Sequence, residues 1–585
     1  YFSSHPPVYE NDTKIFVWNC TLHSAIDVVF DCCAHAHIGR DREEGGTARK
    51  REHCCSRSAC SGLMAKNTPT MATDVDDSYD GSRIFIWVSD YSGLPIDQIN
   101  FLISQFLALG LAPLFRTALH PSTTNPATRH AVGLVLGLAL GYFCFGMQAI
   151  HLGGLPALCY IVMRTQDPHI MQRMVLGVAL LYLSCIHVHR QMYDYGSYTL
   201  DITGPLMVIT QKVTSLAFSL HDGLTRQEDE LTANQKYHVV KKMPTLLEYF
   251  SFMFHFQALM CGPVVFYRDY MDFIDGTNFL KHAPSSSGKL DNNSNSRKVV
   301  FEPSPYLVVF KKVVVSVLCA LLYVKLIPSF PIQRVKEAEF VEDTTVPYKM
   351  CYLIISTTLV RFKYYHAWLL ADAICNASGL GFNGFDQNGN PRWDLISNVD
   401  VLKFEFSLSL RDSIEQWNKG TGRWLRMIVY DRVDRCHTLL TYALSALWHG
   451  FYPGYYLTFM SGAMFTFASR AVRRTIRPYF LNPPWLKSLY DLATLLTTRV
   501  VMGYITFSFV LLGFWPSIRL YLHMYLSLHI LGLLVIVLLP LLPTRPLRAA
   551  TAPHNAANMN GSAHPPQLNG KVAEMSNGFG GGSRG

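Results

Sequence analysis

Long uncharged stretches recur along the chain and decide its class. Residues Ala131–Met163 contain no Asp, Glu, Lys or Arg, and the same holds for Val501–Ile518 and Leu522–Leu542. A helix that crosses a bilayer needs about 20 predominantly apolar residues in a row, and a water-soluble core does not repeat such stretches so often. The pattern therefore predicts an integral membrane protein.

Further apolar stretches raise the prediction to about 10–11 membrane spans. Two of them, Met350–Ile374 and Thr438–Phe467 around His449, carry polar residues. These two are expected to line an interior cavity, because ionisable groups that face lipid are energetically costly. The predicted fold class is all-α, a polytopic transmembrane helical bundle. The other stretches are Ile99–Leu114, Met174–His187, Pro205–Leu220, Leu246–Tyr267, Tyr306–Leu326 and Leu489–Val500.

The composition agrees with this class. Of the 585 residues, 49 % are hydrophobic and 16 % are charged, against roughly 25 % charged in ordinary soluble proteins. The net charge of +9 comes mostly from loops and ends. Since no basic stripe is interleaved with aromatic residues, nucleic acid is not an expected partner. Anionic lipid or the phosphates of a co-substrate suit the basic loops better.

The two ends of the chain differ from its apolar middle. Residues 1–80 show no period and no signal peptide, and the tail over 546–585 has a composition typical of disorder. One continuous transmembrane domain is expected over 90–545, with Gly379–Arg435 as a re-entrant or surface helical layer. No metal site is predicted, because the cysteines and histidines near the start lack usual zinc spacing. They are Cys32, Cys33, His35, His37, Cys54, Cys55 and Cys60.

A histidine in an apolar setting is the first candidate for chemistry. His449 follows the apolar run Leu439–Leu447 and precedes another long apolar stretch. An imidazole has an ordinary pKa of about 6.5, and burial favours its neutral form. It is then available as a general base for a hydroxyl proton. The alternative is a core histidine bonded to a backbone carbonyl, and the residues alone leave both open.

A polar cluster upstream supplies a second candidate. Asn418 carries a neutral amide that can donate to a developing oxyanion, or hold an acyl carbonyl, without adding charge to a dry site. Four nearby arginines form a cationic neighbourhood suited to the phosphates of an acyl carrier. The alternative is a snorkelling, positive face at the membrane edge. The arginines are Arg423, Arg426, Arg432 and Arg435.

Several short motifs follow one another in order along the chain. They are Gln211–Phe218 with His221-Asp222-Gly223; Gly262-Pro263 before Tyr267-Arg268-Asp269-Tyr270; Tyr365–Ala373 with Gly379–Phe382; Trp417-Asn418 with Thr421 and Trp424-Leu425; and Trp448–Tyr455. Each is weak alone, but their order and spacing together are specific. On these motifs the chain resembles the membrane-bound O-acyltransferases, and within them the lysophospholipid acyltransferase branch, over roughly residues 92–535.

The resemblance implies a reaction and two catalytic residues. His449 and Asn418 are expected to face each other in a tunnel through the membrane. His449 would activate the hydroxyl of a lysophospholipid for attack on the thioester of acyl-CoA, and Asn418 would position a substrate or stabilise the oxyanion. Acyl-CoA is a co-substrate here, and the resemblance implies no acyl-enzyme, metal or tightly held cofactor. The implied role is phospholipid remodelling by a multi-pass protein of the endoplasmic reticulum membrane.

Residues around this pair are predicted to contact the substrates. Tyr267, Arg268 and Asp269 lie at a predicted span end and suit a zwitterionic or anionic head group, such as that of lysophosphatidylethanolamine, lysophosphatidylserine or lysophosphatidylcholine. An ordinary aromatic belt explains the same pattern. The other predicted contacts are Trp417, Thr421, Arg423, Trp424 and Trp448.

Other functions remain as alternatives. His189 and Asp194 form an H-x4-D pattern like that of peripheral glycerolipid acyltransferases, but such short spacing is common by chance. Members of the family that acylate proteins, sterols or diacylglycerol are a second alternative. A transporter, with His449, His366 and Asp372 along its path, is a third. No internal repeat of the kind found in transporters is visible.

The first prediction concerns the amino-terminal segment. Because residues 1–63 have no pattern and Met64 and Met71 lie downstream as possible natural starts, a chain that begins at Met64 should insert into membranes and work normally. Membrane fractionation and an activity assay of both chains test this. Loss of activity in the shorter chain, or zinc bound stoichiometrically by the full chain alone, would show that the segment is functional.

Overall fold

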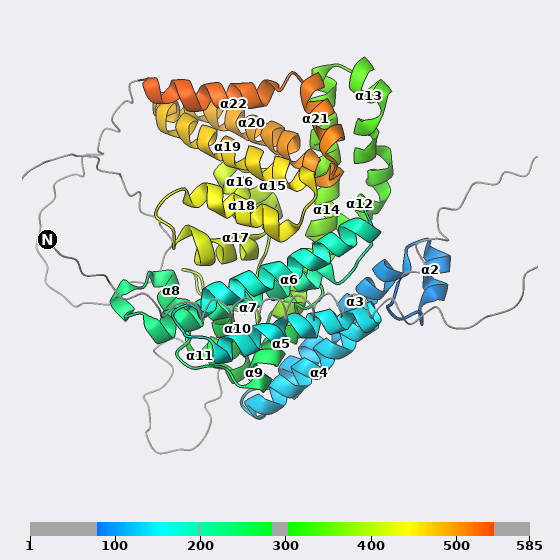
Figure 1. Cartoon of the computed structure of the whole chain (residues 1–585), viewed down its shortest axis with the longest axis vertical. Helices are drawn as coiled ribbons and strands as arrows, with labels where there is room; N and C mark the ends of the chain where they lie inside the picture. Colours follow the sequence, from blue (N-terminus) through cyan, green and yellow to red (C-terminus); the bar gives the residue numbers. More distant parts are fainter. Residues whose placement is uncertain (1–78, 197–198, 283–301, 543–585) are drawn as a thin grey trace, which may run out of the picture. The chain divides into compact units, whose positions relative to one another are not determined.

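The computed structural model describes residues 79–196, 199–282 and 302–542. Every regular element within these ranges is a helix, and the only β interaction there is an isolated bridge between Phe385 and Pro391 (Figure 1). The prediction of an all-α class is therefore confirmed. The expected disordered tail and nearly all of the expected extension over 1–80, with its cysteines and histidines, lie outside the described residues.

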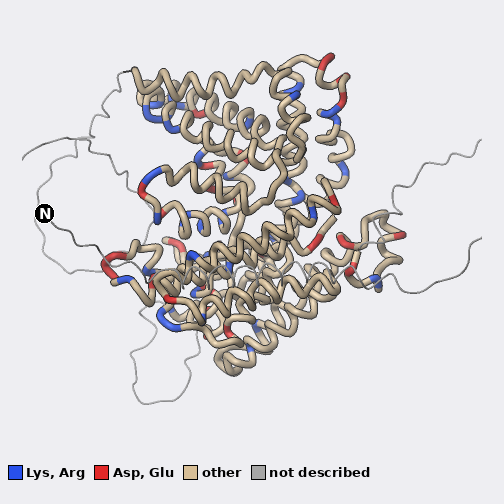
Figure 2. Tube along the Cα trace, in the orientation of Figure 1, with Lys and Arg blue, Asp and Glu red and all other residues tan. Residues whose placement is uncertain are grey.

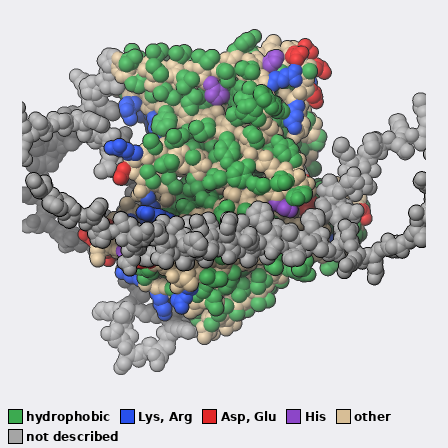
Figure 3. All heavy atoms as spheres, viewed as in Figure 1, with side chains coloured by type: hydrophobic (Ala, Val, Ile, Leu, Met, Phe, Trp, Pro, Cys, Tyr) green, Lys and Arg blue, Asp and Glu red, His purple; other side chains and the backbone are tan. Residues whose placement is uncertain are grey.

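Five helical stretches within the described ranges are long and apolar enough to cross a membrane, or six if a pair bent by 76° counts as one span. Hydrophobic side chains far outnumber charged ones on the part of the face in Figure 3 that is not covered by grey atoms, and charged residues in Figure 2 gather mainly at helix ends and in connections. This distribution is typical of a multi-pass membrane protein. The stretches are α3 (Ile96–Ala118), α4 with α5 (Pro126–Thr165), α6 (Met171–Tyr193), α12 with its continuation (Tyr306–Lys336), α20 (Pro484–Leu511) and the bent pair α21 (Phe514–His523) with α22 (Ser527–Leu538).

Three more helices have the length of a span but bury polar residues. They are α7 (Thr203–Thr225), α14 (Val346–Ser378) and α19 (Pro453–Thr475). In α7 the buried set includes Gln211, Lys212 and Thr214, so this helix faces protein on the side that carries them. The number of 10–11 spans stays a prediction, because length and composition alone do not assign these helices to the membrane.

Helix α14, with 33 residues, contributes to both large hydrophobic cores. Its first two thirds, including Leu353 and Tyr365, pack into a core shared with α19, α20 and α21. Its last third, including Ile374, packs into a second core shared with α3 to α7. It lies against α3, α12 and α20 (Figure 1). The helix therefore holds the two cores in a defined relation.

Two predicted continuous stretches are each divided into two helices. Ala131–Met163 becomes α4 (Pro126–Phe145) and α5 (Ala149–Thr165), separated at Gly146, which has a φ of +52°. Thr438–Phe467 becomes α18 (His437–His449) and α19, separated at Gly450 with a φ of +112°. Glycine reaches this left-handed region without the steric cost that a Cβ brings, so both breaks occur where the sequence permits them.

One predicted span is wrong. The stretch Leu246–Tyr267 is helical only over α9 (Leu246–Phe254), and 255–266 is an irregular buried segment that leads to α10 (Tyr267–Asp275). The ammonium of Lys212 on α7 donates to the carbonyls of Phe252 and Met253, at 3.2 and 3.0 Å. These carbonyls at the end of α9 therefore have a partner outside the helix, which lets the helix stop there.

The segment expected as a helical layer, Gly379–Arg435, contains three short helices. They are α15 (Val401–Glu405), α16 (Leu410–Gln416) and α17 (Lys419–Leu425), and α17 runs into a π-helical turn over Arg426–Tyr430. Helix α17 packs against α7 and α18. The layer thus brings Asn418, which precedes α17, into the part of the molecule that also holds the end of α18.

Candidate functional site

His449 is the last residue of α18, and its hydrogen bond selects one tautomer. Its Nδ1 lies 2.6 Å from the carbonyl oxygen of Ser445. A carbonyl only accepts, so Nδ1 carries a proton, and in the neutral form that burial favours Nε2 keeps a lone pair. Nε2 has no hydrogen-bond partner among the described residues. In this form the imidazole is oriented with its basic nitrogen free.

Aromatic rings surround this imidazole. The ring centroids of Trp448, Phe459, Phe509 and Tyr455 lie 4.6, 4.8, 5.3 and 5.9 Å from that of His449. They come from α18, α19 and α20, so three helices close around one side chain. An apolar wall of this kind lowers the polarity of the surroundings of the half-buried imidazole.

Trp448 is fixed from three sides. Its indole Nε1 donates to the carbonyl of Met207 at 3.0 Å. Its own carbonyl accepts a hydrogen bond from Nε2 of His187 at 3.1 Å, and its ring lies 5.8 Å from that of Trp424. The buried His187 also lies against Gly450, where an added Cβ would come within 2.9 Å of its ring. The sequence marked His187 only as the end of a span, and a histidine there carries no signal of this role.

Helix α17 is anchored on α7 by two side-chain hydrogen bonds. Gln211 Nε2 donates to Thr421 Oγ1 at 2.8 Å, and Trp424 Nε1 donates to Thr214 Oγ1 at 2.8 Å. Trp424 is fully buried. Two motifs that lie more than 200 residues apart in the chain are therefore in contact. Thr421 and Trp424, predicted to contact substrate, hold α17 in place in this structure.

Asn418 lies at the start of α17 in the left-handed region, with a φ of +46°. Its Oδ1 accepts a hydrogen bond from Asn398 Nδ2 at 3.1 Å, and Asn398 also accepts from the backbone of Lys419 and Gly420. The Asn418 Nδ2 group has no partner among the described residues. No hydrogen bond is found there between Asn418 and His449 either. The two are connected through α17 and the Trp424–Trp448 contact.

Trp417 belongs to a different aromatic group. Its ring lies 4.9 Å from that of Trp368, 5.2 Å from that of Phe404 and 5.9 Å from that of Tyr365. These partners come from α14 and α15. The residue immediately before Asn418 is thus packed against α14, on the side of the first hydrophobic core, which includes Leu353 and Tyr365.

The four predicted arginines do not form one cationic group. Arg432 makes a two-point ion pair with the buried Asp222, at 2.8 and 2.6 Å. Arg426 pairs with Asp431, and Arg435 is exposed without a partner among the described residues. Arg423 instead donates to the carbonyl of Leu395 at 3.1 Å and lies over the ring of Phe266 at 5.6 Å.

Arg423 therefore lies near the start of α10, where the head-group residues were predicted. Tyr267 packs against Phe252 with ring centroids 5.3 Å apart. Asp269 is buried and accepts a hydrogen bond from Tyr237 at 2.7 Å, and burial raises the pKa of its carboxyl. Arg268 is half-buried and makes no ion pair among the described residues. The structure thus brings together Arg423 and α10, which the sequence treated as separate groups.

Comparisons with known proteins point to the same family as the sequence motifs. The model of the membrane-bound O-acyltransferase family matches residues 190–507. Lysophospholipid acyltransferase 6 of Drosophila melanogaster is 57% identical over 466 residues, which cover 80% of this chain and 64% of that protein. Membrane-bound glycerophospholipid O-acyltransferases 2 and 1 of Homo sapiens are 41% and 40% identical, over 80% and 79% of this chain and 89% and 93% of their own lengths.

A prediction follows from the different surroundings of Arg432, which is paired with a buried carboxylate, and Arg435, which is exposed. Arg432→Met leaves the carboxylate of Asp222, whose side chain is 1% exposed, with only Arg226 at 3.4 Å. Breaking a buried ion pair typically costs about 3–5 kcal/mol, so the thermal unfolding midpoint of the purified protein should fall by several degrees. Arg435→Met is the matched control and should not change the midpoint. Equal midpoints for the two variants would contradict an anchoring role for Arg432.

Proposed function

The chain belongs to the membrane-bound O-acyltransferase family, and on this premise we propose that it transfers a fatty-acyl group from acyl-CoA to a lysophospholipid within the membrane. The names of its relatives support this acceptor class, since they include a lysophospholipid acyltransferase and glycerophospholipid O-acyltransferases. The observation that carries the proposal is the free Nε2 of His449, whose Nδ1 proton is committed to Ser445.

The proposed reaction is a direct transfer. Nε2 of His449 takes the proton of the acceptor hydroxyl as its oxygen attacks the thioester carbonyl. The tetrahedral intermediate then collapses, the C–S bond breaks, and the imidazolium returns its proton to the leaving thiolate. The products are the diacyl phospholipid and free coenzyme A. Each proton that His449 accepts is returned within one turnover, so no further base is required.

Asn418 is the proposed donor to the developing oxyanion. Its Oδ1 accepts from Asn398, and this bond orients the amide so that Nδ2 is left to donate. A neutral donor suits a site lined by aromatic rings, because a charge there would be costly to desolvate. Loss of one oxyanion donor typically lowers kcat by about 10²–10³-fold.

The substrates are assigned to two parts of the site. The apolar ring of residues around His449 suits the acyl chain, and the α10 region with Arg268, Asp269 and Arg423 suits a phosphate-bearing group. Mixed charge there matches a zwitterionic or anionic phospholipid head group. We place the protein in the endoplasmic reticulum membrane, in the remodelling of phospholipids, in line with its family resemblance.

The next prediction tests the base. Replacing His449 by Ala should lower transfer by about 100- to 10,000-fold, the typical contribution of general-base catalysis, while the protein still inserts and folds. The measurement is thiol release from oleoyl-CoA by purified protein, with and without lysophosphatidylethanolamine. His437→Ala, at the other end of the same helix, is the control and should keep wild-type turnover.

Two outcomes of this assay would count against the proposal. Wild-type turnover in the His449→Ala variant would remove His449 from the mechanism. Equal or faster use of a sterol, diacylglycerol or a peptide serine as acceptor would overturn the phospholipid assignment without affecting the catalytic role of His449.

A further prediction concerns the head group. Arg268→Gln and Asp269→Asn remove one charge each and nearly keep side-chain shape, and an Asn at 269 still accepts from Tyr237. Their effect should appear in the ratio of kcat/KM among lysophosphatidylethanolamine, lysophosphatidylserine and lysophosphatidylcholine, more than in total turnover. Arg392→Gln, in an exposed ion pair with Asp394, is the control. Unchanged ratios in both variants would favour the aromatic-belt interpretation of α10.

A further inference from the structure

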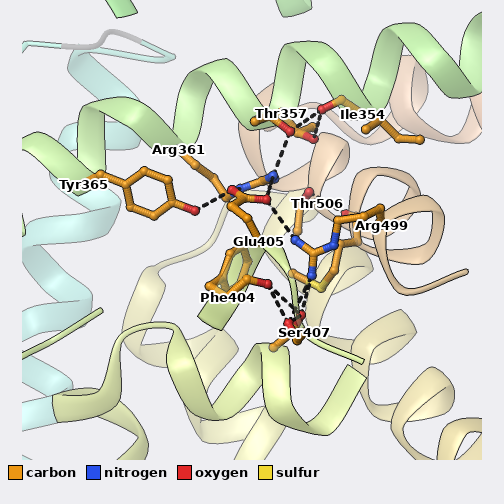
Figure 4. A network of polar contacts seen from close by, with 12 residues as sticks. Ile354, Thr357, Arg361, Tyr365, Phe404, Glu405, Ser407, Arg499 and Thr506 are labelled. Carbon is orange, nitrogen blue, oxygen red and sulfur yellow. Dashed lines mark hydrogen bonds and ion pairs between the residues drawn. The ribbon is translucent and has the colours of Figure 1, made fainter. Parts of the chain in front are cut away.

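A largely buried carboxylate joins three helices beside the first hydrophobic core, the one that includes Leu353 and Tyr365 (Figure 4). Oε1 of Glu405, at the end of α15, accepts hydrogen bonds from Arg361 Nε at 3.0 Å and from the Tyr365 hydroxyl at 2.6 Å. Oε2 accepts from Arg361 Nη2 at 3.0 Å and from Arg499 Nη1 at 2.9 Å. Arg361 and Tyr365 belong to α14, and Arg499 belongs to α20. One side chain thus fixes α15 against both helices.

The carboxylate forms a cluster with Arg361, Tyr365 and Arg499, and the charges in this cluster depend on each other. The side chains of Arg361, Arg499 and Glu405 are only 10%, 15% and 20% exposed. Burial alone would raise the pKa of the Glu405 carboxyl, but Arg361, Tyr365 and Arg499 together hold it below its ordinary value. The carboxylate is therefore anionic and lies between two guanidinium groups. Without its charge, two half-buried cations would face each other unneutralised.

The cluster also reaches α16 through two hydroxyls. Arg499 Nη2 donates to Ser413 Oγ at 2.5 Å, and the hydroxyls of Ser413 and Ser407 lie 2.6 Å apart. Ser413 is on α16, and Ser407 lies between α15 and α16. Both α15 and α16 are thereby tied to α20. The residue that follows α16 is Trp417.

Trp417 connects this cluster to Asn418. Phe404, the neighbour of Glu405 in the chain, lies 5.2 Å from the Trp417 ring, and Tyr365 lies 5.9 Å from it. The backbone N–H of Asp400, at the start of α15, donates to the carbonyl of Gln416 at 3.3 Å. The segment just before Asn418 is therefore held by Asp400 and Phe404, which are close to Glu405 in the chain, and by Tyr365, which donates a hydrogen bond to Glu405.

The backbone of Asn418 lies in an uncommon region. Its φ of +46° is left-handed, which is uncommon for residues other than glycine, although asparagine tolerates it better than most. Asn398 holds Asn418 from one side, and Trp417 is the link on the other. Release of Trp417 would let the backbone relax and move the Asn418 amide.

We propose that Glu405 is a positioning residue for Asn418: by clamping α15 between Arg361 and Arg499 it fixes Trp417 and thereby aims the Asn418 amide into the site. The proposal rests on the proposed function, since it assumes that Asn418 acts on the reacting carbonyl. Glu405 itself touches neither substrate nor His449.

The experiment is a double-mutant cycle on the full-length protein with oleoyl-CoA and lysophosphatidylethanolamine. Glu405→Gln should lower kcat by about 10- to 100-fold, because a misplacement of about 1 Å in a catalytic group costs up to that much. In the Asn418→Ala background, where His449 still supports slow transfer, the same substitution should change kcat by less than about twofold. Residues that act through one another are non-additive in this way.

Glu302→Gln is the matched control for lost stability. Glu302 is also a largely buried carboxylate held by two groups, Arg116 at 3.1 Å and His120 at 2.9 Å. It should lower the thermal midpoint about as Glu405→Gln does, with kcat unchanged. If Glu405→Gln fails to fold, Tyr365→Phe removes one hydroxyl bond to Glu405 with little change of shape, and the cycle is run with that variant.

The outcomes separate this inference from the proposed function. An equal fall of kcat on Glu405→Gln in both backgrounds, or no fall in the wild-type background, overturns the positioning role. Wild-type kcat in the Asn418→Ala variant alone removes Asn418 from the mechanism and with it the positioning role, while transfer by His449 stands.

Discussion

The buried polar side chains of α7 are the constraint on which most of this arrangement depends. Gln211, Lys212 and Thr214 are each at most 1% exposed. Neither lipid nor a packed interior offers them water, so each must find a partner in the protein. Gln211 and Thr214 find theirs on α17, and Lys212 finds the last carbonyls of α9. One helix thereby orients two others and, through Trp424, the end of α18.

This constraint separates residues that support the site from those left to react. Trp424, Thr421 and Arg432 have their polar groups committed to protein partners. The Nε2 of His449 and the Nδ2 of Asn418 stand apart, because each belongs to a side chain whose other polar atom is held. A group that is oriented and yet unpartnered requires no reorganisation when a substrate arrives, which is the usual basis of electrostatic catalysis.

The site also lies where two hydrophobic cores meet along α14. Trp424 and Trp448 belong to the core that includes α7, whereas Trp417 packs toward the core that includes Tyr365 and Phe404. Asn418 stands between these sides with its backbone in the left-handed region, which asparagine tolerates better than most residues other than glycine. Asn398 and the aromatic group around Trp417 hold it there.

The sequence by itself determined the class of the molecule and supplied the candidates for its reactive residues. Apolar runs predict α3, α6, α12 and α20, since a span is a local property of composition, and the motif around Trp448-His449-Gly450 marks His449 without any contact information. Tertiary structure decided the rest. It ended α9 at Phe254 through Lys212, paired Arg432 with Asp222 and brought Arg423 to α10. The reason is physical: apolarity and helix breaks act over a few neighbouring residues, whereas the partner of a buried polar group comes from a distant part of the chain.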